Sequence, residues 1–73
     1  MPLADFERLV LRLANQTFVR YALWLNYPKD PPLMGIDFGS KGHTMLQQDL
    51  TERGLAWDEM RGMWTVERTD LEL

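Results

Sequence analysis

Hydrophobic residues recur at helical spacing along the first part of the chain. Over residues 3–14 the apolar positions lie three or four residues apart, while Asp5, Arg8 and Arg12 fall outside this stripe. Pro2 suits the start of a helix, and acidic side chains are favourable near the positive end of the helix dipole. The pattern predicts an amphipathic helix over residues 3–14.

The next stretch, TFVRYALWLN at residues 17–26, is apolar at almost every position. Only Arg20 interrupts it, and its many β-branched and aromatic residues are typical of a buried strand. In the alternative interpretation the first helix continues to Tyr27, because its apolar stripe is nearly maintained as far as Leu25. We favour the strand, and the sequence leaves both interpretations open.

Residues 28–43, PKDPPLMGIDFGSKGH, are rich in proline and glycine. The prolines exclude a regular helix and the glycines permit sharp bends, so we expect one long connection here. A connection of this length in a small domain is often functional.

A second helix is expected to begin at Thr44, because Thr44 and Gln47 have the spacing of a capping box. Gly54 follows the last polar turn and suits the left-handed position that commonly ends a helix.

The pattern after Gly54 is typical of a β-hairpin, with LAWD before and MWTVER after the residues EMRG. A four-residue loop from Glu59 to Gly62 places Trp57 opposite Trp64 and gathers the apolar side chains on one face. A three-residue loop would pair Trp57 with Thr65 and mix the faces, so the longer loop is favoured. We expect Trp57 and Trp64 to be buried, leaving the third tryptophan for an interface.

Together these elements predict one small α+β domain spanning residues 1–73. The expected order is helix, strand, helix, β-hairpin, with the strand at 17–26 completing a three-stranded antiparallel sheet, since a lone hairpin is marginal in water. The alternative is one long N-terminal helix, a second short helix and the C-terminal hairpin. The acidic tail at 69–73 is expected to be flexible.

Composition favours contact over chemistry. The 73 residues include no cysteine and one histidine, yet 45% are hydrophobic and three are tryptophan. Without cysteine there is no disulfide or thiolate metal site, which fits a reducing cytoplasm. The net charge of −3 argues against autonomous nucleic-acid binding. The longest apolar run is too short to span a membrane, and the first ten residues lack the apolar segment of a signal peptide.

Candidate catalytic and cofactor motifs are weak. His43 has no recognisable nucleophile partner and is expected to be exposed just before the second helix. Asp37 and His43 alone do not define a metal site. The glycines of GIDFGSKG, residues 35–42, are one residue too close for a phosphate loop. The sequence therefore predicts no enzyme activity, no cofactor and no metal.

Candidate partner-binding residues lie in the 28–43 connection and at the tip of the predicted hairpin. Methionine, aromatic residues and arginine are frequent at the centres of protein interfaces, and a hydrophobic residue at an exposed turn is unusual. The candidates are Lys29, Asp30, Met34, Phe38, Lys41, Met60 and Arg61.

Three segments carry a resemblance: the helix LADFERLVLRL, the apolar YALWLNYP that follows it, and the C-terminal MRGMWTVERTDLEL. They resemble the small proteins of lytic phages, including a phage of Xanthomonas, that bind the RNA polymerase of the bacterial host. The resemblance spans the whole chain. It implies binding to the N-terminal region of the polymerase β′ subunit near the RNA exit channel, inhibition of some host promoters, and antitermination.

Three other functional classes remain open. A small enzyme or ligand-binding domain would need His43 and nearby carboxylates to converge in a pocket. The same contact residues would suit an inhibitor or adaptor of a different host protein. Apolar strand faces would also suit a self-associating structural domain, although we expect a monomer when the protein is free.

Overall fold

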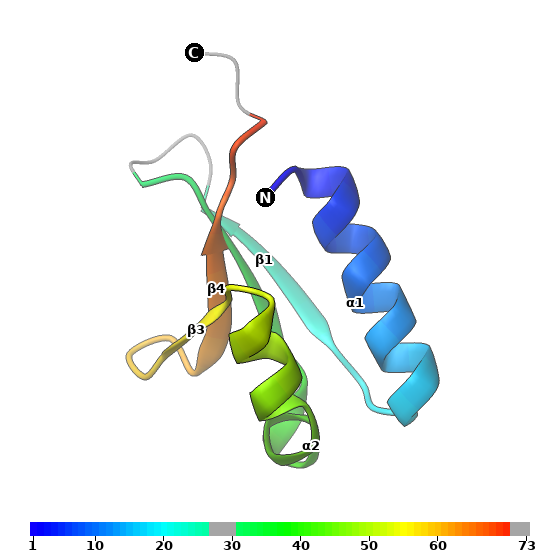
Figure 1. Cartoon of the computed structure of the whole chain (residues 1–73). Coiled ribbons are helices and arrows are strands. Elements are labelled where there is room, and N and C mark those ends of the chain that lie inside the picture. The colour runs from blue at the N-terminus through cyan, green and yellow to red at the C-terminus, as the bar shows by residue number, and fades with distance from the viewer. Residues whose placement is uncertain (27–30, 71–73) are drawn as a thin grey trace.

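The computed structural model describes residues 1–26 and 31–70, which form two helices and four strands (Figure 1). In chain order the elements are α1 (Leu3–Thr17), β1 (Ala22–Asn26), β2 (Leu33–Asp37), α2 (Gly39–Glu52), β3 (Ala56–Asp58) and β4 (Met63–Glu67). The predicted α+β class is confirmed, and the sheet has four strands where the sequence predicted three.

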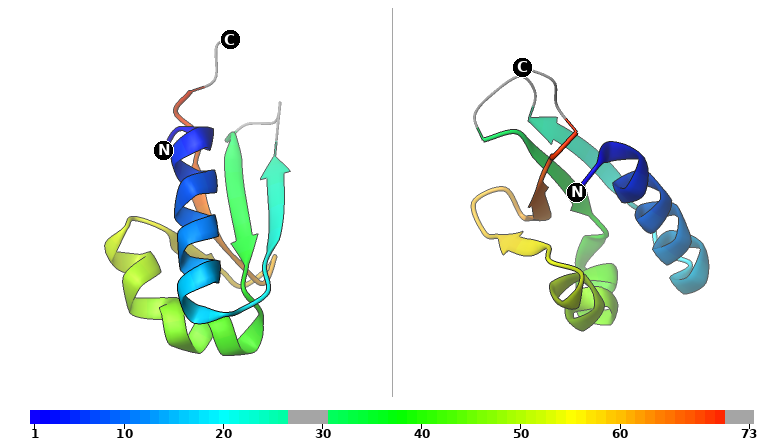
Figure 2. Two further views of the ribbon diagram at one scale, coloured as in Figure 1. Left: turned by 90° about the vertical axis from the view of Figure 1, so that its right-hand side faces the viewer. Right: turned by 45° about the horizontal axis from the view of Figure 1, so that its top comes forward.

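The sheet is antiparallel throughout, with the strand order β1-β2-β4-β3. Met34 lies opposite Val66 and Ile36 opposite Trp64, and directly opposed residues point to the same side of a sheet. The buried side chains of both helices pack against this face (Figure 2). Among the described residues, no helix covers the opposite face, which we call the open face.

α1 buries Phe6, Leu9, Val10 and Leu13 of the predicted stripe, together with Ala14, while Leu3 at the start of the stripe is partly buried. The helix runs three residues further than expected, to Thr17, and ends where Phe18 adopts the left-handed conformation with φ 55° and ψ 37°. The strand expected at 17–26 is therefore shortened to β1. The alternative description, a long N-terminal helix, a second short helix and a C-terminal hairpin, also fits α1, α2 and the hairpin. Its helix does not continue to Tyr27, because β1 begins at Ala22.

The long connection expected at residues 28–43 is wrong for most of its length. Residues 33–37 form the central strand β2, and α2 begins at Gly39. Met34 and Ile36 are fully buried beneath the helices, so the apolar alternation decides the structure despite the neighbouring prolines and glycines. Residues 28–30 of the predicted connection lie outside the described residues.

Two local features explain why α2 begins at Gly39 and not at Thr44. The Oδ1 atom of Asp37 accepts a hydrogen bond of 2.8 Å from the Gly39 N–H, which satisfies one of the free donors in the first turn. Phe38 then folds over the helix, where a Cβ atom on Gly42 would lie 2.3 Å from the Phe38 Cβ. Only glycine allows this contact.

The predicted hairpin register is confirmed. Trp57 lies opposite Trp64, and the turn spans Glu59 to Gly62. The burial prediction is correct for Trp64, which is 3% exposed, and wrong for Trp57, which is 38% exposed because β3 is an edge strand. Trp24 lies half-buried on the open face, so only one tryptophan belongs to the core.

Residues 69 and 70 of the predicted flexible tail contact the N-terminus. The Thr69 N–H donates to the carbonyl of Met1, and the Asp70 carboxylate accepts from the Leu3 N–H at 3.1 Å. Arg68 and this N–H hold the pKa of Asp70 below its usual value. Residues 71–73 lie outside the described residues. Neither described helix has the length and apolar character needed to cross a lipid bilayer.

Candidate functional site

The turn between β3 and β4 is held by one carboxylate. The Oδ1 atom of Asp58 accepts hydrogen bonds from the backbone N–H groups of Met60 and Arg61, both at 3.1 Å. Its Oδ2 atom pairs with Nη1 of Arg61 at 2.7 Å. The Gly62 N–H donates to the Asp58 carbonyl at 2.8 Å, with Gly62 at φ 68°. The turn is thus ordered by its own side chains.

This network also sets the charge of the turn. The hydrogen bond from the Arg61 side chain is the main cause that holds the pKa of Asp58 below its usual value, and the backbone N–H of Arg61 adds to it. Asp58 is therefore ionised at neutral pH and remains a strong acceptor for the turn.

Met60 projects from this ordered turn with 96% of its surface exposed. An exposed methionine on a fixed backbone can enter a pocket on another protein without first losing the conformational freedom of a flexible loop. Arg61 is part of the same turn, and its guanidinium lies 5.0 Å from the centre of the Trp24 ring. This is cation–π range, so Arg61 links the turn to the open face.

On the open face, Trp24 and Met63 close over Gly35. A Cβ atom on Gly35 would lie 2.5 Å from Sδ of Met63 and 3.0 Å from Cε3 of Trp24. The glycine in the middle of β2 therefore lets the two large side chains approach the backbone. The result is a half-buried apolar patch in the centre of the open face, with Arg61 at its margin.

On the helix side of the hairpin, three aromatic rings form a cluster. The His43 ring centre lies 4.3 Å from that of Trp57 and 5.3 Å from that of Trp64, and the two indoles meet edge to face at 5.4 Å. The expectation that His43 is exposed before a helix is wrong, since it lies within α2 and is partly buried. Within the described part of the chain, His43 Nδ1 and Trp64 Nε1 are buried without a hydrogen-bond partner.

A hollow of about 440 Å³ lies against this cluster. Its lining comes from the end of β2, the first turns of α2 and the hairpin: Asp37, Gly39, Ser40, His43, Thr44, Trp57 and Gly62. We call this hollow together with Met60 and Arg61 the hairpin-end surface. The hairpin contributes Trp57 and Gly62 to the hollow, while its turn presents Met60 and directs Arg61 over Trp24 toward the open face. Tryptophan and arginine are enriched among the residues that dominate binding energy at interfaces, and methionine is enriched at interface cores.

The same hollow holds a serine, a histidine and an aspartate, but their arrangement is not that of a nucleophile and its base. No hydrogen bond joins His43 to Ser40 or Asp37, and Asp37 is engaged with the Gly39 N–H. An activated serine requires a base within hydrogen-bond reach. Among the described residues, no three histidine or acidic side chains are grouped so as to hold a metal ion.

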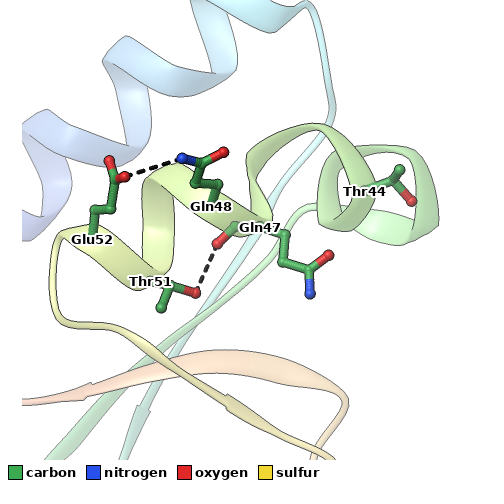
Figure 3. Close-up of a pocket in the computed structure, with 5 residues that line it drawn as sticks. All are labelled: Thr44, Gln47, Gln48, Thr51 and Glu52. Atoms are coloured by element: carbon green, nitrogen blue, oxygen red, sulfur yellow. Dashed lines mark hydrogen bonds between the residues drawn. The ribbon is translucent and has the colours of Figure 1, made fainter.

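A second hollow lies along the outer face of α2 (Figure 3). Its polar side chains bond within their own helix: Thr51 donates to the Gln47 carbonyl at 2.8 Å, and Gln48 donates to Glu52 at 3.2 Å. These groups are already paired on the helix surface, so the hollow offers few free polar groups to a ligand.

Five of the seven candidate residues lie in the part of the chain that the structure describes. Met60 and Arg61 lie together on the hairpin-end surface, and Lys41 is exposed on α2. Met34 and Phe38 are core residues, 0% and 3% exposed, so direct contact with a partner is wrong for them in this fold. Lys29 and Asp30 lie outside the described residues.

Sequence reasoning missed His43 and Trp57 as parts of one surface. The signal was present in the hairpin register, which put Trp57 beside Trp64. The predicted helix start at Thr44 obscured this signal, because the orientation of a residue before a helix is not fixed. In the structure His43 lies within α2, and its ring packs against Trp57 and Trp64.

Comparisons with known proteins add no relative. No protein-family model matches the chain, and no significant match was found among curated proteins or solved structures.

Proposed function

We propose that this protein acts by binding another protein through the hairpin-end surface, without catalysis. The observation that carries the proposal is Met60, 96% exposed on a turn that Asp58 holds with two backbone hydrogen bonds and one ion pair. Replacing an exposed apolar side chain with a polar one normally leaves folding stability unchanged. Here Asp58 orders the turn that carries it, and two other residues of the hairpin, Trp57 and Gly62, line an aromatic hollow.

The partner we propose is bacterial RNA polymerase, reached in the host cytoplasm. The resemblance of the sequence to phage proteins that bind this enzyme supports the choice, and charge agrees with it. The protein carries a net charge of −3. An acidic surface is attracted to the basic channels through which a polymerase passes nucleic acid, which speeds association.

Occupancy of a site near the RNA exit channel would explain both regulatory effects without a catalytic residue. A protein bound there inhibits initiation at some promoters and hinders the terminator hairpin, giving antitermination. Such control requires the protein to bind one conformational state of the polymerase more tightly than another.

The test is the dissociation constant for purified host polymerase and for the isolated β′ N-terminal region, measured with three proteins. These are the unaltered chain, Met60→Ala, and Met45→Ala as a control. Met45 is also an exposed methionine, 52% exposed, but it lies two residues from His43 and so on a different side of α2.

We expect Met60→Ala to weaken binding about tenfold, which corresponds to about 1.4 kcal/mol, and Met45→Ala to leave it unchanged. Read-through at an intrinsic terminator should fall in parallel. Absence of micromolar binding by the unaltered chain would contradict the polymerase assignment. Tight binding to a different host protein, sensitive to Met60→Ala, would keep the binding function and replace the partner.

A further inference from the structure

The opposite edge of the sheet carries a second apolar surface. β1 is the outermost strand next to β2, and Figure 2 shows no other described segment beyond it. One row of its backbone N–H and C=O groups therefore faces no strand. Leu23 and Leu25, on the helix side, are 48% and 46% exposed, and Tyr21 just before them is 41% exposed.

The apolar exposure is concentrated here. Eight large hydrophobic side chains are exposed among the described residues, and five of them fall between residues 11 and 25. These five are Leu11, Phe18, Tyr21, Leu23 and Leu25, which we call the β1 strip. Figure 1 shows that a short connection joins the C-terminal end of α1 to β1, and Phe18 and Tyr21 lie in that connection.

Phe18 is the most unusual member of the β1 strip. It is 91% exposed and adopts φ 55°, the only positive φ among the described residues other than glycine. Glycine is the usual residue at this position after a helix, because a Cβ atom is unfavourable there. A strained and exposed phenylalanine gains nothing within the isolated domain, and backbone strain of this kind is typical of functional sites.

We propose that two copies of this chain pair through antiparallel β1 strands to form a twofold dimer. The β1 strip is self-complementary. A twofold axis through Trp24 sets Leu23 of each copy opposite Leu25 of the other, so apolar side chains meet on the helix side. No charged residue occurs from Tyr21 to Asn26, and like charges opposite one another would disfavour pairing. The two Arg20 side chains lie at opposite ends of the paired strands.

A second copy fits this edge better than an open chain of copies. Head-to-tail growth would pair β1 with β3, but β3 has only three residues and ends at Asp58, which is bonded into the turn. An isologous contact between identical edges closes after two copies. A typical interface buries about 800 Å² per partner, about one sixth of the 5047 Å² surface of the described chain.

Pairing through β1 has a functional consequence. β1 and β3 are the two opposite edges of the sheet, so the dimer would leave Met60 and the hollow accessible, while Arg61, which lies over Trp24, would sit near the twofold axis. The dimer proposal does not depend on the polymerase assignment, since it rests on the exposed β1 edge and the β1 strip, none of whose five residues belongs to the hairpin-end surface.

The test is the association state by sedimentation equilibrium, from micromolar to near-millimolar protein, for three proteins. Leu23→Lys places a charge on the β1 strip, and Ala56→Lys places the same charge on the β3 edge, where Ala56 is exposed. We expect the unaltered chain and Ala56→Lys to dimerise alike, and Leu23→Lys to weaken dimerisation at least tenfold. Circular dichroism checks that each variant is folded.

The register has its own test, because the chain lacks cysteine. A single Trp24→Cys variant, treated with a short bis-maleimide, should give a covalent dimer, and Ala56→Cys should stay monomeric. A chain that remains monomeric throughout would overturn the proposal, as would dimers that are insensitive to Leu23→Lys or equally sensitive to Ala56→Lys. A monomer whose polymerase binding is lost in Leu23→Lys would reassign the β1 strip to that partner and likewise overturn the dimer.

Discussion

The two edges of the sheet are built in opposite ways. β3 is three residues long, its end is fixed by the Asp58 network, and its tryptophan packs against His43 and Trp64. β1 is five residues long, carries no charge, and leaves Leu23 and Leu25 half exposed. Proteins usually protect sheet edges by shortness and charge. The β3 edge has both protections and the β1 edge has neither. This difference supports the proposal that β1 pairs with a second copy of the chain.

The contrast also separates two kinds of recognition surface. At the β3 edge, ordered polar contacts present a few side chains in fixed positions. At the β1 edge, an extended apolar strand offers backbone groups and leucines together. The first arrangement suits a compact pocket on a different protein, and the second suits pairing with another strand.

The largest expected loss of stability follows from replacing Trp64, the buried residue that packs against the β3 edge. Trp64 is 3% exposed, and the rings of His43 and Trp57 both pack against it. Trp64→Ala should lower the free energy of unfolding by about 3–5 kcal/mol, as for other buried aromatic residues. Trp57→Ala, which removes a 38% exposed ring, should cost clearly less. Urea unfolding measures both, and equal losses would contradict the assignment of only one tryptophan to the core.

The next effect concerns the helix beneath that edge. Alanine normally stabilises a helix interior by about 1 kcal/mol relative to glycine, but Gly42→Ala would place a Cβ atom against the Phe38 Cβ. We expect a net loss of about 1–3 kcal/mol from overpacking. Ser40→Ala, at an exposed position of the same helix, is the control and should change stability little. A stabilised Gly42→Ala variant would show that Phe38 does not pack as described.

A smaller effect is expected at the turn. Because the pKa of Asp58 is lower in the folded protein than in the unfolded chain, its stabilising contribution is present above the unfolded pKa. The contribution is lost as pH falls through the folded value, so acid should loosen the turn. The protection factors of the Met60 and Arg61 amides, which compare each exchange rate with that of an unstructured peptide at the same pH, should therefore fall below about pH 4. In Asp58→Ala these protection factors should be low at every pH, and a turn equally protected in that variant would refute the role of the carboxylate.

The smallest change in stability is expected at Phe18, next to the β1 edge, where the substitution should stabilise the domain and not destabilise it. Phe18→Gly relieves the left-handed strain and removes little buried surface, so it should stabilise the domain by about 0.5 kcal/mol. The same change removes an aromatic ring from the β1 strip and should weaken dimerisation. Thermal melts and sedimentation measure the two effects separately. A destabilised variant would mean that the Phe18 ring contributes to the monomer.

Local patterns predicted the parts of the fold that depend on local sequence. The helical stripe from Phe6 to Ala14 and the pairing of Trp57 with Trp64 followed from periodicity and from matching faces. The sequence does not predict β2, because the prolines before the strand and the glycines in and after it are typical of a connection and obscure the alternation of Met34 and Ile36. That alternation has meaning only when β1 and β4 flank the strand, and β4 lies about thirty residues away in the sequence.

The sequence predicted the residues at the hairpin turn of the candidate site, but it did not predict the aromatic cluster of His43 and Trp57. A methionine beside an arginine at a turn is a visible signal, and Met60 and Arg61 were identified from it. The stacking of His43 on Trp57 depends on where α2 begins, which is set by the Asp37 cap and by the contact of Phe38 with Gly42. Both contacts are local in the chain, but the spacing of apolar residues does not reveal them.

The most direct test of the central claim is a hydrogen-exchange footprint of this protein, free and bound to purified bacterial RNA polymerase. We expect binding to slow amide exchange at Met60, Arg61 and the first turns of α2, and to leave exchange in β1 unchanged. Protection confined to β1 and Phe18, with Met60 and Arg61 unchanged, would contradict the assignment of the hairpin-end surface as the binding site. Unchanged exchange throughout the chain would contradict polymerase as the partner.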